Sequence, residues 1–86
     1  MDKYKVLILP SVFKDFKTIP RKDKEKILKK IEELAINPHP IGSIRLSGDE
    51  KFRIRHGNYR ILYRIEDDKL VVVIVKVGHR KDVYKS

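Results

Sequence analysis

The basic residues of this sequence fall into two chemical types according to their position. Nine of the ten before position 40 are lysines, with Arg21 as the exception. Six of the eleven after position 40 are arginines: Arg45, Arg53, Arg55, Arg60, Arg64 and Arg80. Lysine is a flexible, strongly hydrated point charge, whereas arginine offers a planar fork of donors that matches the oxygens of a phosphate. The sequence therefore predicts a phosphate-binding site in the second half of the chain.

A second group of chemically capable side chains follows the apolar run "LVVVIVKV". The segment "GHRKDVY" brings together His79, Arg80, Lys81 and Tyr84. An imidazole titrates near neutrality and can transfer a proton, and a phenol ring can stack on a nucleobase. Structural roles are the alternatives, because a histidine in a turn can bond the backbone and a terminal aromatic ring can cover a sheet edge. Both interpretations stay open at this point.

The histidines and acidic residues do not form a metal-binding pattern. His39, His56 and His79 are far apart in three separate loops, and the chain contains no cysteine. Metal sites in proteins require several ligands at characteristic spacings. We therefore expect neither a metal nor another cofactor.

The net charge points to an anionic partner. The formal charge is +9, from 21 Lys and Arg against 12 Asp and Glu. Such a charge attracts nucleic acid, a ribosome or an acidic protein, and a membrane surface is the weakest of these candidates. Charge that serves only solubility is the alternative interpretation.

The length and the apolar runs indicate one small domain. A chain of 86 residues has room for a single core, so we expect one domain over residues 1–86. The apolar run at residues 70–75 is too short to cross a bilayer, and the sequence begins without the pattern of a secretory leader. The lack of cysteine fits the cytoplasm, where we expect the protein to act.

The order of the predicted elements is strand, helix, helix, strand, strand, strand. Residues 3–9 read as a strand ended by Pro10, and Ser11 is the expected cap of a short helix. Pro20 suits the first turn of a second helix, whose apolar positions are Ile27, Leu28, Ile31, Leu34 and Ala35. After a loop at 38–50, strands are expected at 51–55, 59–65 and 70–77. This order predicts an α+β fold, with a two-helix hairpin and a three-stranded antiparallel meander, and both helices on one face of a mainly antiparallel four-stranded sheet.

The register of the first hairpin follows from its turn. If Gly57 and Asn58 form a two-residue turn, the expected opposite pairs are His56 with Tyr59, Arg55 with Arg60, Ile54 with Ile61, Arg53 with Leu62, and Phe52 with Tyr63. Side chains alternate between the two faces of a sheet. One face, which the helices would cover, then carries Phe52, Ile54, Ile61, Tyr63 and Ile65. The other face, called the arginine face below, carries Arg53, Arg55, Arg60 and Arg64.

The arginine face requires compensation, because like charges opposite each other repel. Water and salt, the acidic turn after Ile65, or a bound polyanion could each supply it, and four arginines on one face favour the polyanion. With Asp67 and Asp68 as the next turn, Val71, Val73 and Val75 should lie beside Arg64, Leu62 and Arg60 as an apolar floor. That last strand should deliver the terminal cluster close to Arg60 and Arg55.

The stretch from "IRLSG" to "VGHRKDVY", and above all "YRILY" and "VGHRKDVY", resembles the RelE branch of the RelE/ParE toxin superfamily. Members are small basic toxins of toxin–antitoxin pairs. RelE-type members enter the ribosomal A site and cleave mRNA without a metal, whereas ParE-type members share the fold and inhibit DNA gyrase. The resemblance covers nearly the whole chain.

The resemblance implies roles for individual residues. Catalytic positions of the RelE pattern match Arg53, Arg55, Arg60, Arg80 and Tyr84, with His79 as a further candidate for proton transfer. RNA-binding positions are expected at Arg45, Lys51, Arg64 and Lys81. The implied reaction is attack of a ribose 2′-OH on the adjacent phosphate, and the implied partners are a RelB-like antitoxin, the ribosome and mRNA. A noncatalytic gyrase inhibitor and a plain RNA-binding module remain the alternatives.

Overall fold

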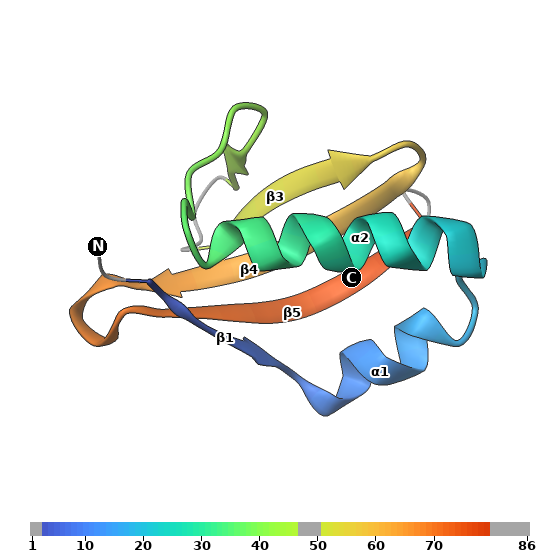
Figure 1. Cartoon of the computed structure of the whole chain (residues 1–86), viewed down its shortest axis with the longest axis horizontal. Helices are drawn as coiled ribbons and strands as arrows, with labels where there is room; N and C mark the ends of the chain where they lie inside the picture. The colour runs from blue at the N-terminus through green and yellow to red at the C-terminus, as the bar shows by residue number, and fades with distance from the viewer. Residues whose placement is uncertain (1–2, 47–50, 80–86) are drawn as a thin grey trace.

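The structure, a computed structural model, describes residues 3–46 and 51–79. Two helices and five strands occur among them (Figure 1). In chain order they are β1 (Lys5–Ile8), α1 (Pro10–Phe16), α2 (Arg21–Leu34), β2 (Ile44–Arg45), β3 (Lys51–His56), β4 (Tyr59–Glu66) and β5 (Val71–His79), with a 3-10 turn (Asp67–Lys69) before β5.

All five strands form one sheet in the order β1-β5-β4-β3-β2. β1 runs parallel to β5, and every other neighbouring pair is antiparallel. Figure 1 shows α2 lying across the front of the sheet, with α1 below it at the end of β1. The predicted α+β class and the helix-covered face are therefore confirmed.

The sheet has one strand more than the sequence predicted. β2 consists of Ile44 and Arg45 and pairs with Arg53 and Phe52 of β3. Two residues carry no detectable alternation, because a periodic pattern needs at least four or so positions. The sequence pattern therefore places these two residues in the loop at 38–50.

The helices begin slightly differently from the prediction. Leu9 is the residue before α1 and Pro10 occupies its first turn, so Ser11 does not cap this helix. A proline suits this position because its missing N–H would have no partner within the helix. Pro20 likewise precedes α2 instead of lying inside it. The predicted apolar stripe of α2 is present, with Ile27, Ile31 and Leu34 buried.

The core lies between the helices and the sheet. Its buried residues come from both helices and from the central strands: Val12, Phe16, Ile19, Ile27, Ile31, Leu34, Ile54, Ile61, Tyr63, Val72, Ile74 and Val77. The hydroxyl of Tyr63 donates a hydrogen bond of 2.8 Å to the carbonyl oxygen of Pro38, so the buried ring also ties the loop after α2 to the sheet. Burial raises the pKa of this hydroxyl more than its hydrogen bond with Ser43 lowers it.

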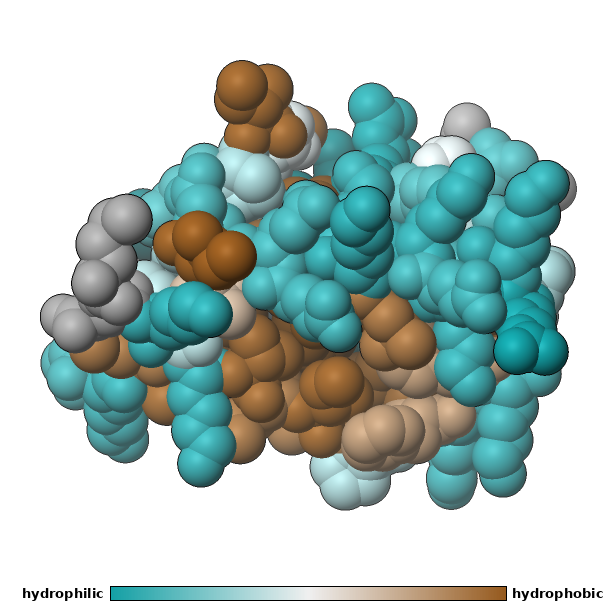
Figure 2. Space-filling view, in the orientation of Figure 1, coloured by the Kyte–Doolittle hydropathy of each residue, from teal (hydrophilic) through white to brown (hydrophobic). Residues whose placement is uncertain are grey.

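The helix-covered side also leaves apolar surface in contact with solvent. Figure 2 shows a hydrophobic area below the hydrophilic outer surface of α2. Leu9 and Phe13, at the start of α1, are among the large apolar residues that remain exposed. No helix in the described ranges 3–46 and 51–79 is long and apolar enough to cross a bilayer.

The register of the first hairpin is as predicted. All five expected pairs are present, and Lys51 opposite Arg64 extends them. Gly57 has a positive φ of 57°, which is the conformation that a tight hairpin turn requires of it.

The register of β5 differs from the prediction by two residues at Arg64 and by three at Arg60. The turn is longer than expected, because Asp67–Lys69 form a 3-10 turn and Leu70 follows in the left-handed region with a φ of 53°. Val73 therefore lies opposite Arg64. The pairing next skips Val75 in a β-bulge, so that Lys76 lies opposite Leu62 and Gly78 opposite Arg60. No residue type marks the bulge, because every residue from 71 to 75 is apolar.

Candidate nucleic-acid interface

Five cations share the sheet face opposite the helices. Arg53 and Arg55 come from β3, and Arg60 and Arg64 from β4, as the alternation of side chains requires. Lys51 joins them because it pairs with Arg64. Two of the cross-strand pairs, Arg55 with Arg60 and Lys51 with Arg64, therefore place like charges opposite each other.

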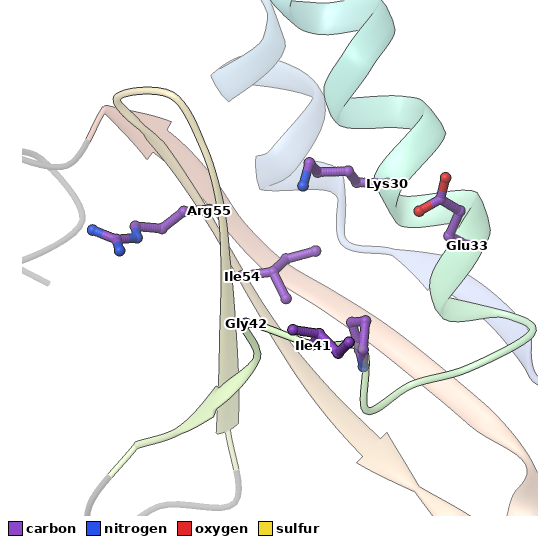
Figure 3. A pocket seen from close by; sticks show the side chains of 7 residues that line it. Lys30, Glu33, Ile41, Gly42, Ile54 and Arg55 are labelled. Carbon is purple, nitrogen blue, oxygen red and sulfur yellow. The ribbon is translucent and has the colours of Figure 1, made fainter.

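Figure 3 makes the alternation visible at one point of β3. The side chain of Ile54 points toward α2 and Ile41, whereas that of Arg55 points away from the helix. Ile54 lines a hollow of about 340 Å³ between α2 and the segment around Ile41, with Arg55 at its rim. Arg55 thus marks the border between the helix-covered side and the arginine face.

The arginines of this face differ in their exposure to solvent. Arg60 is only 4% exposed, whereas Arg55 and Arg64 are exposed and Arg53 is intermediate. An arginine keeps its charge under all physiological conditions. Charge interactions of a buried guanidinium are screened less than those of an exposed one, since the surrounding dielectric constant is lower. The charge of Arg60 is therefore screened less by solvent than that of Arg55 or Arg64.

The expected apolar floor exists, although its members differ from the prediction. Leu62 and Val73 are buried and lie at register positions on the arginine face. Val75 is displaced by the bulge, and Lys76 takes the position opposite Leu62. The side chain of Lys76 does not extend the arginine row, because its Nζ lies 3.7 Å from Oδ1 of Asp15 on α1.

The end of β5 lies close to Arg60 as expected, although Gly78 and not Val75 is the residue opposite it. Gly78 is opposite Arg60 and His79 is opposite Tyr59. β5 thus ends beside the Arg55–Arg60 pair, and Arg80 is the next residue in the chain. Arg80, Lys81 and Tyr84 lie outside the described residues, and their roles remain predictions.

The structure does not bring His79 together with the arginines. His79 shares the register position of Tyr59, which belongs to the helix-covered face, and the two rings meet edge to face at 5.9 Å between centroids. Both rings line an open hollow of about 450 Å³ beside Lys14 and Thr18 of α1. His56 lies on the same side, 3.5 Å from the carboxylate of Asp23 on α2.

Arg45 also lies apart from the other cations. It pairs with Phe52, which faces the helices, whereas its neighbour Ile44 pairs with Arg53. Arg45 is exposed on the edge strand β2, so it borders the arginine face without belonging to it. Within residues 3–46 and 51–79, no group of three His, Asp or Glu side chains could hold a metal ion.

The arrangement suits the binding of a phosphodiester. A row of guanidinium groups on an antiparallel hairpin offers many N–H donors to phosphate oxygens. The pair Arg55–Arg60 places two of these forks at directly opposite positions, next to the end of β5. Donors fixed in this way stabilise negative charge that develops on a reacting phosphate.

Comparison with known proteins identifies the family of this chain. The family model described as the ParE toxin of the type II toxin–antitoxin system parDE matches residues 6–84. Toxin RelE1 of Methanocaldococcus jannaschii is 35% identical over 88 residues and covers 98% of each chain. The mRNA interferase toxin RelE of Escherichia coli is 30% identical over 78 residues, which are 85% of this chain and 81% of that protein.

A solved structure supports the same assignment. A chain in the crystal structure of the toxin–antitoxin complex RelBE2 from Mycobacterium tuberculosis matches with a TM-score of 0.79 and 28% identity, over 91% of this chain and 99% of that one. Sequence and fold therefore agree along nearly the whole length. The chain belongs to the RelE/ParE family of toxins from type II toxin–antitoxin systems.

Proposed function

We propose that this toxin is a ribosome-dependent endoribonuclease that cleaves mRNA in the A site and so inhibits translation. The observation that carries the proposal is the direct pairing of Arg55 with a buried Arg60 beside the end of β5. Two like charges in that position destabilise a sheet, and a phosphate bound between them would offset the repulsion. The name of the Escherichia coli relative, an mRNA interferase, supports the same activity.

The reaction is attack of a ribose 2′-OH on the neighbouring phosphate. The O–P bond to the 5′ oxygen of the next nucleotide breaks, which yields a 2′,3′-cyclic phosphate and a free 5′-OH. Arg53, Arg55, Arg60 and Arg80 stabilise the charge of the pentavalent phosphate. Removing one such donor raises the barrier by roughly 3–4 kcal/mol, a factor of about 10² to 10³ in rate.

The proton transfers require a group other than arginine, because a guanidinium does not lose its proton in proteins. Tyr84 and His79 are the proposed candidates of the terminal cluster. Tyr84 ranks first, since His79 lies on the helix-covered side with Tyr59. Stacking of the Tyr84 ring on a base of the codon is a second role for the same side chain. No step of this reaction uses a metal.

Other cations hold the RNA without taking part in the chemistry. Lys51 and Arg64 continue the row on the hairpin, Arg45 borders it, and Lys81 follows it in the chain. Ribosomal RNA and message both present phosphates, so these residues raise affinity in a salt-dependent way. The proposed site of action is the cytoplasm, where ribosomes translate.

The proposed restraining partner is a RelB-like antitoxin. The RelBE2 protein of Mycobacterium tuberculosis was solved as a toxin–antitoxin complex. With a net charge of +9, this chain favours an acidic amphipathic segment that orders as it binds. Such a segment would cover the arginine face or displace the end of the chain.

The test adds toxin made by cell-free synthesis to purified ribosomes that carry a defined message. Primer extension should show a cut within the A-site codon, and the products should end in a cyclic phosphate and a 5′-OH. A message with a 2′-O-methyl group at the cut position should stay intact. Cleavage of the methylated message would contradict the 2′-OH mechanism.

A gyrase inhibitor is the second candidate, because the matching family model is described as a ParE toxin. The same preparation is therefore added to a gyrase supercoiling assay. The nuclease proposal predicts unchanged supercoiling. Inhibition of gyrase together with an uncut message would reverse the ranking. RNA binding without either effect would indicate a plain RNA-binding module.

A further inference from the structure

Among residues 3–46 and 51–79, no strand lies beside the end of β5 on the side of β1. β1 pairs with β5 as far as Ile8 opposite Ile74, and the N–H of Leu9 donates the last ladder bond to Ile74 at 3.2 Å. The chain then turns into α1 at Pro10. β5 continues to His79, so its last five residues form an edge where N–H groups need other acceptors.

A side chain of α1 supplies the missing acceptor. Oδ2 of Asp15 accepts a hydrogen bond of 3.2 Å from the N–H of Val77, and Oδ1 lies 3.7 Å from Nζ of Lys76. The carboxylate is only 19% exposed, which strengthens both interactions relative to a surface pair. Val12 and Phe16 share this face of α1 and are buried in the core, so the helix holds Asp15 against the strand.

The β-bulge is what directs the N–H of Val77 toward Asp15. The carbonyl oxygen of Ile74 accepts its hydrogen bond on the β1 side. In a regular strand, the backbone N–H and C=O groups of residues 76 and 78 would point to the same side. The extra residue Val75 shifts this alternation by one. Val77 then turns its N–H to the β1 side, whereas its side chain is 1% exposed in the core.

We propose that Asp15 is a positioning residue for the nuclease site. It fixes Val77, and Val77 is bonded to Gly78, which lies opposite Arg60. The hydrogen bond between Val77 and Asp15, called the anchor below, therefore determines where the end of β5 lies relative to the arginine pair. The catalytic part of this inference rests on the proposed function, whereas the anchor itself does not.

The experiment compares three variants of the full chain. Asp15→Ala removes the acceptor and the charge, and Asp15→Asn keeps an oxygen acceptor for Val77 but loses the charge. Glu32→Ala, which removes an exposed carboxylate from α2, is the matched control. Two quantities are measured: the hydrogen exchange of the Val77 amide by NMR, and single-turnover cleavage of ribosome-bound message at increasing ribosome concentration.

We expect the Val77 amide to exchange at least about tenfold faster in Asp15→Ala, because the opening of this edge no longer breaks a hydrogen bond. The maximal cleavage rate should fall by about 10- to 100-fold, as expected for misplaced groups, while the half-saturating ribosome concentration stays the same. Glu32→Ala should behave like the wild type in both measurements, within a factor of about 3 that general context effects allow. Asp15→Asn should fall between the wild type and Asp15→Ala, because the amide keeps an acceptor for Val77 but loses the charge that strengthens the bond.

Each other outcome overturns a definite part of the proposal. Unchanged Val77 exchange in Asp15→Ala would show that the anchor does not hold the strand. Faster exchange with an unchanged maximal rate would show that the anchor does not position the site. If the wild type cleaves no message, the proposed function fails, and the exchange measurement still decides whether Asp15 anchors β5.

Discussion

Arg55 and Arg60 are direct partners across the β3–β4 hairpin, yet only Arg60 is buried. Opposite residues of an antiparallel pair bring their Cβ atoms to about 4.5–5.5 Å, a distance at which like charges destabilise the sheet. A protein selected for stability alone would place an acid or an uncharged residue at one of these positions. The pair therefore supports the proposed site, in which two cations act at one point.

This relationship predicts that Arg55→Gln separates stability from activity. The substitution removes one of the two like charges from an exposed position, so the free energy of unfolding should stay equal or rise by up to about 1 kcal/mol. Cleavage of ribosome-bound mRNA should fall at the same time. Urea unfolding of the variant and the wild type measures the first quantity. A clear loss of stability would mean that Arg55 holds the fold together and is not strained within it.

Arg64 should contribute to affinity and not to the chemical step. Arg64→Gln is expected to raise the half-saturating ribosome concentration and to lower the slope of log affinity against log salt by about 0.7–0.9, the value for one phosphate contact. The maximal cleavage rate should stay close to that of the wild type. Arg21→Gln is the control, since Arg21 is an exposed arginine on α2 that pairs with Glu25 at 3.4 Å.

Ribosome titrations at several salt concentrations test whether Arg64 contributes a phosphate contact. If Arg64→Gln leaves the salt slope unchanged, the RNA does not cross this part of the arginine face. If Arg21→Gln changes the slope as much as Arg64→Gln, the effect is one of net charge alone.

Tyr63→Phe should weaken the fold without touching the arginine face. The variant leaves the carbonyl oxygen of buried Pro38 without the 2.8 Å bond, which costs about 1–3 kcal/mol of unfolding free energy. Tyr4→Phe is the control, because the hydroxyl of Tyr4 bonds Asp67 at an exposed position and its loss should cost less.

The same tyrosine gives a pH dependence of definite sign. Burial raises the pKa of Tyr63 in the folded state, so the folded protein holds this proton more tightly than the unfolded chain. Its contribution to stability is complete below pH about 10, the value for an unperturbed tyrosine, and is lost as the pH rises through the folded pKa. Unfolding between pH 9 and 11 should therefore show a shallower decline for Tyr63→Phe than for the wild type. Equal declines of the unfolding free energy in both proteins would contradict the raised pKa of Tyr63.

The sequence was sufficient for the parts of the fold that local rules determine. The turn at Gly57 and Asn58 set the hairpin register, and that register placed four arginines on one face. The stripe at Ile27, Ile31 and Leu34 likewise predicted the buried side of α2. In each case a short-range pattern, either a turn type or a helical period, was enough to predict which residues face the core.

The remaining features depend on contacts between distant segments. Val75 is skipped in the pairing of β5, and an all-apolar strand gives no hint of such a bulge. His79 was grouped with the arginines because it is close to Arg80 in the chain, whereas the pairing with Tyr59 puts it on the other side of the sheet. Asp15 looked like an ordinary helix residue, since its partner Val77 is 62 positions away.

The central claim is that the arginine face stabilises the reacting phosphate of an mRNA. Its most direct test is the single-turnover cleavage rate of ribosome-bound message by the wild type, Arg55→Gln, Arg60→Gln and the control Arg21→Gln, with folding checked by circular dichroism. The account predicts that each face variant loses about 10²- to 10³-fold in maximal rate, whereas Arg21→Gln cleaves like the wild type. If folded Arg55→Gln and Arg60→Gln both cleave at the wild-type rate, the arginine face is not the catalytic site.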